Sequence, residues 1–184
     1  MSLGLDQLLA LENQRRRSGT GLKTSDLVGC WQLQRVWSKG SRREAVLGGW
    51  LLRGLAARLE ISAVERADKA AQGDDQAAVA DPALRLSNAV NLGLLELRFH
   101  GPGRLQGRRP LLMFQFDQLQ LIVAGRVVLQ RQLPAPVPTR LPFFALISRE
   151  PEGWLSARGR GGGLAQWRLQ RPLADARAQP ELEP

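Results

Sequence analysis

The stretch Leu-Val-Gly-Cys-Trp-Gln-Leu-Gln-Arg-Val at residues 27–36 decides the fold, because it predicts a strand with one buried side. Its alternation places Gly29, Trp31 and Leu33 on one face and two glutamines on the other, the period of a half-buried β-strand. A glycine two residues before a tryptophan lets another segment approach the backbone where a large ring must be covered. We therefore expect Trp31 in the core of a sheet that later strands complete.

Length and composition indicate one globular domain. The chain has 184 residues, of which 43% are hydrophobic and 23% are charged. No apolar run reaches the roughly 18–20 residues that span a bilayer, and the first residues lack the basic and apolar segments of a secretory signal. Cys30 is the only cysteine, which excludes an internal disulfide and fits a reducing compartment. We expect a cytoplasmic protein.

Positive charge is concentrated in the second half of the chain. The net charge is +9, and residues 84–171 carry 13 basic and 4 acidic side chains. Such a balance points to acidic partners, namely nucleic acid, anionic lipid or an acidic protein. Only Lys23, Lys39 and Lys69 are lysines, so a GC-rich genome explains the arginine content equally well.

A helix is expected before the sheet. Between residues 3 and 17, the leucines at positions 5, 8 and 9 share one helical stripe, with Asp6 near the start and three arginines at the end. These charges suit the helix dipole at both ends. We expect this short amphipathic helix to pack on the sheet, so that residues 1–24 form a helix and a linker.

Strand patterns are clearest from residue 84 onward. Apolar and polar residues alternate at 95–100, and Gly101-Pro102-Gly103 predicts a turn. Two further apolar sets, at 112–116 and 119–123, differ in parity by one residue at Asp117-Gln118. A bulge or tight turn there would keep both sets pointing inward.

A hairpin is predicted at Ala124-Gly125-Arg126. Beyond it Val127, Leu129 and Leu133 alternate, but Arg131 falls on the same face. Because a buried charge needs a partner, we expect Arg131 at a barrel rim or paired with an acidic side chain.

The remaining segments complete roughly eight antiparallel strands. Residues 45–59 fit either a helix or a bent strand, and 68–82 fit a mobile loop. We predict a mostly β fold, an antiparallel lipocalin-like (calycin) β-barrel over residues 25–171 with a short N-terminal helix. A flexible tail is expected at 172–184.

The predicted inward face is rich in aromatic side chains. A barrel of about eight strands is just wide enough to hold one small ligand or to be filled by its own side chains. If a cavity exists, its lining is Trp31, Leu97, Phe99, Phe114, Phe116 and Trp167. Apart from the indoles such a lining offers almost no hydrogen-bond donors, so its ligand would be rigid and apolar.

Catalytic and metal sites have little support in the sequence. His100 is the only histidine and Cys30 the only cysteine, so a catalytic triad has one possible base and a structural zinc site lacks ligands. We interpret His100 as a solvated strand residue and Cys30 as packing against a covering helix. No metal or cofactor is predicted, and the sequence favours a non-enzymatic function over an enzymatic one.

A glycine-rich run, Arg158-Gly-Arg-Gly-Gly-Gly, precedes the last predicted strand. It fits a hairpin turn, an anion nest between Arg158 and Arg160, or a single RNA-binding repeat. A further interpretation stacks one of these arginines on the Trp31 ring and closes one end of the barrel. Arg131, Arg158 and Arg160 are thus candidates for closing the barrel or binding an anion.

The first and last strands resemble the plastid lipid-associated (fibrillin) family in its short cyanobacterial form. The family's Leu-x-Gly-x-Trp strand corresponds to Leu27–Trp31, and its Arg-Gly-x-x-Gly-x-Leu segment to Arg158–Leu164. Here the leucine comes one residue late, and Trp154 stands for the tyrosine that precedes the family's arginine. The resemblance implies a lipocalin-like barrel associated with thylakoid and plastoglobule lipids, carotenoids or prenylquinones.

Three hypotheses of function follow. The first is a non-enzymatic carrier of a lipid, carotenoid, quinone or tetrapyrrole, in peripheral contact with an anionic photosynthetic membrane such as the thylakoid through its arginine-rich face. The second is a bilin chromophore lyase, since S-type bilin lyases also use a lipocalin-like barrel, with Arg131 holding a propionate. The third is a basic adaptor for an acidic protein or, with less support, nucleic acid.

Overall fold

The computed structural model describes residues 2–41, 58–64, 84–135, 137 and 141–171. Most of the ambiguous segment 45–59, the expected loop at 68–82 and the tail at 172–184 lie outside these residues. The described elements are α1 (Leu5–Ser18), η1 (Thr24–Leu27), β1 (Gly29–Trp37), β2 (Arg58–Ala63), β3 (Leu84–Leu92), β4 (Leu95–Gln106), β5 (Leu111–Phe114), β6 (Gln118–Val123), β7 (Arg126–Gln132), β8 (Phe143–Glu150), β9 (Trp154–Gly159) and β10 (Leu164–Arg171).

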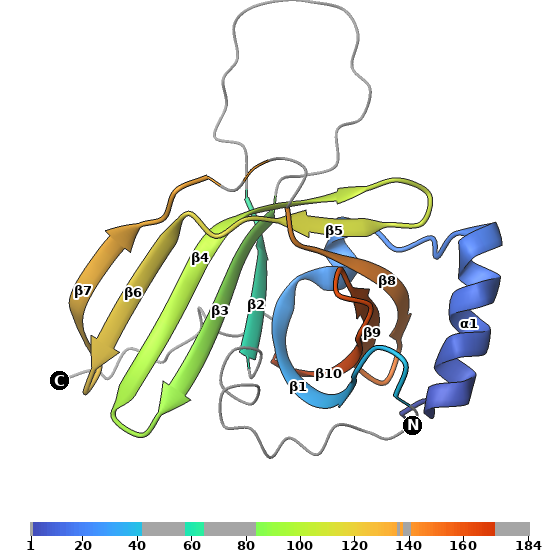
Figure 1. Ribbon diagram of the computed structural model, residues 1–184, viewed down its shortest axis with the longest axis horizontal. Helices are drawn as coiled ribbons and strands as arrows, with labels where there is room; N and C mark the ends of the chain where they lie inside the picture. Colours follow the sequence, from blue (N-terminus) through green and yellow to red (C-terminus); the bar gives the residue numbers. More distant parts are fainter. Residues whose placement is uncertain (1, 42–57, 65–83, 136, 138–140, 172–184) are drawn as a thin grey trace, which may run out of the picture.

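Eight of the described strands close into an antiparallel barrel (Figure 1). They follow the order β3-β2-β1-β10-β9-β8-β5-β4, and β4 returns to β3. Trp31 of β1 pairs with Leu169 of β10, so the first strand closes against the last. The predicted mostly β, lipocalin-like barrel with a short N-terminal helix is confirmed.

Two described strands, β6 and β7, do not belong to this ring. β6 pairs with the first half of β4, and β7 pairs with β6. In Figure 1 they extend the sheet away from the barrel, on the side opposite α1. We call residues 88–100 and 118–132, which form this open part of the sheet, the wing.

The division between barrel and wing lies at Gln115–Asp117. Phe114 pairs with Gly103 and Gln118 pairs with His100, so the segment between them holds one residue more than the facing segment of β4. This extra residue is the predicted bulge, and it keeps the apolar sets of β5 and β6 on the same face. On their other edges β5 pairs with β8 and β6 pairs with β7, which separates the two parts of the sheet.

The predicted turn at Gly101-Pro102-Gly103 is wrong, because β4 runs straight through it. Both glycines permit close packing instead. A Cβ on Gly101 would lie 1.7 Å from the Gln115 carbonyl oxygen, and one on Gly103 would lie 2.1 Å from Leu86 Cδ1. Pro102 lacks an N–H where β4 changes its partner from β6 to β5, so the ladder loses no bond there.

The hairpin between β6 and β7 is confirmed, with Ala124 at a φ of 48°. The parity expected beyond it is wrong. Leu129 pairs with Leu121 but Val127 pairs with Ile122, because a bulge lies between these pairs. Val127 and Leu129 therefore lie on opposite faces of the wing.

The core fills the ring around Trp31, which is fully buried. The Trp31 indole nitrogen donates to the Leu27 carbonyl oxygen at 2.7 Å, so its polar atom is satisfied inside the protein. Leu27 of η1 belongs to the same cluster, and its other buried members come from strands throughout the barrel: Leu59, Ile61, Leu84, Leu86, Leu105, Leu112, Phe114, Leu146, Leu155, Ala157 and Trp167.

The helix α1 packs on the outer surface of the barrel beside β8, as predicted (Figure 1). Leu8 is fully buried there and forms a second apolar cluster with Trp37, Ile147 and Leu164. This packing makes α1 part of the folded domain rather than a separate N-terminal segment.

Candidate functional site

Five aromatic rings form a continuous chain from the barrel core to the wing. Trp167 lies 5.2 Å from Phe144, and Phe144 lies 5.2 Å from Phe114, measured between ring centroids. Phe114 then lies 5.5 Å from Phe116, which lies 5.6 Å from Phe99. Rings at such spacings attract each other beyond the burial of their area. The chain crosses the bulge that divides barrel from wing.

The wing end of this chain is more exposed than its two core members Trp167 and Phe114. Trp167 is 3% exposed and Phe114 is 9% exposed. Phe116 and Phe99, at the wing end, are half-buried. Solvent therefore reaches the aromatic chain where the barrel meets the wing.

An apolar row continues from Phe99 across the wing. Phe99 pairs with Leu119, while Leu97 pairs with Leu121 and Leu121 with Leu129. Paired residues share a face of the sheet, so this row continues the interior face of the barrel. Leu129 is 52% exposed and the other members are half-buried. Part of the apolar face of the wing is thus open to solvent.

The opposite face of the wing is polar. His100 Nε2 lies 3.2 Å from Gln120 Oε1, and Gln120 Nε2 donates to Gln130 Oε1 at 3.3 Å. Arg98 forms an ion pair with Glu96 on the same face. His100 is therefore one member of a polar ladder on a strand. Beside the β6–β7 turn the same face also carries Ile122 and Val127, so it is polar except near that turn.

The predicted lining residues fall into two groups. Trp31, Phe114 and Trp167 are buried in the core. Leu97, Phe99 and Phe116 are half-buried at or beyond the bulge. All six lie on the interior face, and the second group is the more exposed one. We call the surface formed by Leu97, Phe99, Phe114, Phe116 and Leu121 the junction site.

The arginine on the Trp31 ring is Arg149, not Arg158 or Arg160. Its guanidinium carbon lies 5.4 Å from the ring centroid. A bulge between Leu146 and Ser148 shifts the parity of β8 and brings Arg149 to the interior face. A cation over an indole ring is favourable, and this one closes the end of the barrel at Trp31.

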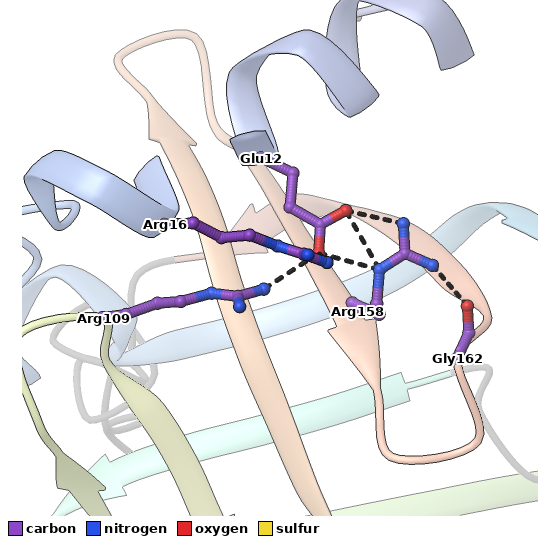
Figure 2. Close-up of polar contacts among 5 residues, drawn as sticks. All are labelled: Glu12, Arg16, Arg109, Arg158 and Gly162. Carbon is purple, nitrogen blue, oxygen red and sulfur yellow. Dashed lines mark hydrogen bonds and ion pairs between the residues drawn. The ribbon is translucent and has the colours of Figure 1, made fainter. Parts of the chain in front are cut away.

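Arg158 binds Glu12 of α1 instead (Figure 2). Its guanidinium donates to both carboxylate oxygens, with Nε–Oε1 at 2.8 Å and Nη2–Oε2 at 2.6 Å. Arg109 and Arg16 donate to Oε1 at 2.8 and 3.2 Å. The Glu12 side chain is only 3% exposed, so one buried carboxylate holds three arginines. We call these four residues the Glu12 cluster.

The charge state of Glu12 follows from this geometry. Burial alone would raise the pKa of its carboxyl, but hydrogen bonds from Arg158 and Arg16 and the charges of both arginines lower it below the usual glutamate value. The bonds to Glu12 in turn raise the pKa of Arg158 against its own desolvation. Glu12 is therefore ionised at neutral pH and attaches α1 to the barrel.

A basic face adjoins the Glu12 cluster. The end of α1, with Arg15–Arg17, lies against the turn between β4 and β5 (Figure 1). A Cβ on Gly19 would lie 2.6 Å from the Arg108 carbonyl oxygen, which shows how closely these segments approach. Arg16, Arg17 and Arg108 are exposed there. We call Arg15–Arg17, Arg108 and Arg109 the basic face.

Sequence reasoning missed Glu12, although a signal was present. Glu12 follows Leu8 by four residues and therefore lies on the apolar stripe of the helix. A carboxylate on such a stripe needs a buried cationic partner. Of its partners only Arg16, four residues later on the helix, could be named from the sequence, because Arg158 follows 146 residues later.

The other candidate residues are dispersed. Arg131 is exposed on β7 and pairs with Leu119, at the edge of the apolar face of the wing. Arg160 is exposed and donates to the Leu141 carbonyl oxygen at 3.0 Å. Cys30 is half-buried and accepts a hydrogen bond from Arg58 Nε at 3.2 Å.

Among the described residues, no three histidine, cysteine, aspartate or glutamate side chains are grouped as a metal site requires. In the same part of the chain, no helix has the length and apolar character to cross a bilayer.

The sequence matches no family model, no curated protein and no solved structure. The resemblance to the fibrillin family therefore stays a prediction.

Proposed function

We propose that the protein binds an apolar molecule at the junction site without transforming it. One observation carries this proposal: the aromatic chain leads from the buried Trp167 to the half-buried Phe99, at an apolar surface that solvent reaches. Covering apolar surface gains roughly 25 cal/mol per Å² removed from water. A flat apolar ligand laid on these rings would gain such burial.

The chemistry of the junction site favours a ligand with few polar groups. Its five side chains are leucines and phenylalanines, which offer neither hydrogen-bond donors nor acceptors. A polar ligand would lose its bonds to water without replacement there. The same five side chains include no nucleophile and no acid or base, which supports binding rather than catalysis.

The resemblance to the fibrillin family supplies the proposed ligand class. It suggests a lipid, carotenoid or quinone of a photosynthetic membrane, and a tetrapyrrole is the fourth class that we propose. Peripheral contact with an anionic membrane, such as the thylakoid, belongs to the same proposal. No feature of the wing or the Glu12 cluster specifically favours the lyase or the adaptor hypothesis.

Titration with a prenylquinone and with β-carotene tests the proposal through quenching of tryptophan fluorescence. Phe116→Ala is expected to weaken the affinity about tenfold, the effect of losing roughly 1.4 kcal/mol. Phe143→Ala is the matched control, because Phe143 is also half-buried but pairs with Met113 on the outer face. Circular dichroism confirms that both variants are folded.

Thermal unfolding gives an independent measurement. A ligand at a hundred times its Kd stabilises the folded state by about 2.7 kcal/mol. The proposal is wrong if no member of the four ligand classes quenches the fluorescence or raises the melting temperature of the wild-type protein.

A further inference from the structure

We propose that the free end of the wing inserts into the surface of a lipid bilayer. This end consists of the β3–β4 turn with Leu94 and the β6–β7 turn with Val123, Ala124 and Val127, and we call it the wing tip. The inference rests on the proposed function, because the bilayer would be the source of the apolar ligand.

Exposed aliphatic side chains gather on the wing. Seven large apolar residues are exposed in the part of the chain that the structure describes. Five of them belong to the wing, with exposed fractions from 38% to 79%: Leu94, Val123, Val127, Val128 and Leu129. Such a concentration marks an interaction surface, whereas scattered single residues do not.

The two turns of the wing tip lie side by side. Ala124 N donates to the Leu94 carbonyl oxygen at 2.8 Å, and Leu95 pairs with Val123. Figure 1 shows both turns ending together at the lower left, away from α1. Leu94 is 79% exposed and Val127 is 53% exposed. One flat surface can therefore contact both turns at once, and a bilayer is such a surface.

A second copy of the chain fits this surface less well. Pairing through the free edge of β7 would cover Val128 and Leu129 but not Leu94, because β6 and β4 lie between. β7 also carries an arginine, Arg131, on its apolar face and a bulge at Val128. Both features are known to keep edge strands from pairing with another chain.

The charge of the wing suits an anionic bilayer. Arg126 is exposed directly after the β6–β7 turn, and Arg131 is exposed on the same strand. The acidic Glu96 is already paired with Arg98. Each arginine near an anionic surface contributes about 1 kcal/mol, which salt screens, whereas insertion of Leu94 and Val127 resists salt.

The wing tip is also the start of an apolar path to the junction site. Next to Leu94, the pair Leu95 and Val123 begins an apolar row that continues through Leu97 and Leu121 to Phe99. A ligand that leaves the bilayer along this row never has to cross bulk water. The basic face lies on the other side of the molecule, beside α1, so one flat bilayer cannot contact both surfaces (Figure 1).

Flotation with phosphatidylcholine vesicles, with and without phosphatidylglycerol, tests the proposal on the full chain. Leu94→Asn is expected to weaken vesicle binding about tenfold, since burying a leucine is worth roughly 1.5–3 kcal/mol. Asparagine is well suited to a turn, so folding should be kept. Val64→Thr is the control, because Val64 is also exposed, at 42%, but lies far from the wing tip. It follows Ala63, which pairs with Leu84 at the start of β3, whereas the wing tip lies after the last residue of β3.

Other variants separate the alternatives. If Arg17→Gln with Arg108→Gln weakens vesicle binding and Leu94→Asn does not, the basic face docks instead and the proposal is overturned. It is also overturned if the wild-type protein is a dimer without vesicles and Val127→Thr makes it a monomer, because the surface then joins two copies.

Ligand binding without vesicles separates this proposal from the proposed function. Leu94→Asn is expected to bind a prenylquinone added in detergent as tightly as the wild type does. If the wild-type protein binds vesicles through the tip but no ligand, the proposed function fails and the docking surface stands. If Leu94→Asn loses ligand binding without vesicles, Leu94 belongs to the ligand site and the docking proposal fails.

Discussion

The barrel and the wing belong to one sheet, share strands β3 and β4 and carry similar aliphatic side chains, but they differ in what covers those side chains. Around Trp31 the interior face is enclosed by the ring of strands, and Leu112 is fully buried. On the wing the same face reaches solvent, and Leu129 is 52% exposed. The change of strand partner at Gln115–Asp117 accounts for this difference, because β5 continues into the ring through β8 whereas β6 pairs with β7 outside it.

Because of this difference, the wing and not the barrel core has apolar surface that is open to a binding partner. Stability of a small domain comes mainly from buried apolar area. The barrel supplies that buried area. The apolar face of the wing stays in contact with water, which is unfavourable and is not needed for folding. Such a face is retained in a folded protein when it has a partner.

The largest expected effect is a difference in the loss of unfolding free energy between alanine variants of two leucines in the same sheet. Leu112→Ala is expected to lower the free energy of unfolding by about 2–5 kcal/mol, because it leaves a cavity in the core. Leu129→Ala, on the exposed edge of the wing, should change it by less than about 0.5 kcal/mol. Urea unfolding measures both. Equal losses of unfolding free energy would show that the wing contributes to the core as much as the barrel does, and would contradict the distinction between the two regions.

The second-largest effect is expected at the boundary between the barrel and the wing. Gly101→Ala is expected to cost about 1–3 kcal/mol, since its Cβ would overlap the Gln115 carbonyl oxygen. Gly161→Ala is the control, because no atom lies within 4 Å of a Cβ there. Thermal unfolding compares them. An unchanged melting temperature in Gly101→Ala would mean that the bulge is free to move away from β4.

The Glu12 cluster tests the attachment of α1 to the barrel. Glu12→Gln leaves three arginines around a neutral amide and is expected to cost about 1–2 kcal/mol at neutral pH. Glu60→Gln is the control, because Glu60 is 31% exposed in its pair with Arg58 and such pairs contribute roughly 0–1 kcal/mol.

The pH dependence sharpens this prediction. Folding lowers the pKa of Glu12, so its stabilising contribution is complete above the usual glutamate pKa. The contribution is lost as the pH falls from there through the lowered folded-state pKa. Wild type and Glu12→Gln should therefore converge in stability at acid pH. A constant difference across that range would contradict the assignment of an ionised Glu12.

The smallest effect concerns ligand choice at the edge of the wing. Arg131 shares a face with Leu119 beside the junction site. Arg131→Gln is expected to weaken binding of an apolar ligand with a carboxylate by about 2–5-fold, the range of an exposed ion pair. Binding of a neutral carotenoid should not change. Equal weakening for both ligands would show that Arg131 acts through the fold.

Much of the fold followed from periodicity. Alternation identified β1, β6 and the interior position of Trp31, since burying one face of a strand requires a period of two. The parity slip at Asp117-Gln118 even indicated the bulge. What periodicity could not show is that the strands on its two sides pair with different partners, because pairing depends on segments distant in sequence.

The errors have equally local causes. Gly101-Pro102-Gly103 has the composition of a turn. Its glycines are needed because a Cβ at either position would clash with Gln115 or Leu86, and these contacts exist only in the folded chain. An arginine over Trp31 was expected, yet the bulge in β8 selects Arg149. The candidate lining was placed on the correct face, while the burial that divides it into core and surface depends on closure of the ring.

The pairing of β1 with β10, together with the bond between Glu12 and Arg158, has a consequence for biosynthesis. On the ribosome, the first strand must wait for the last strand before the barrel can close. The hairpins β3–β4 and β6–β7 need only short loops, which form faster than contacts between distant segments. We expect the nascent chain to expose a formed wing before its barrel exists, and pulsed hydrogen exchange would show protection in β4 ahead of β1. A chaperone or a membrane surface would then meet the wing first.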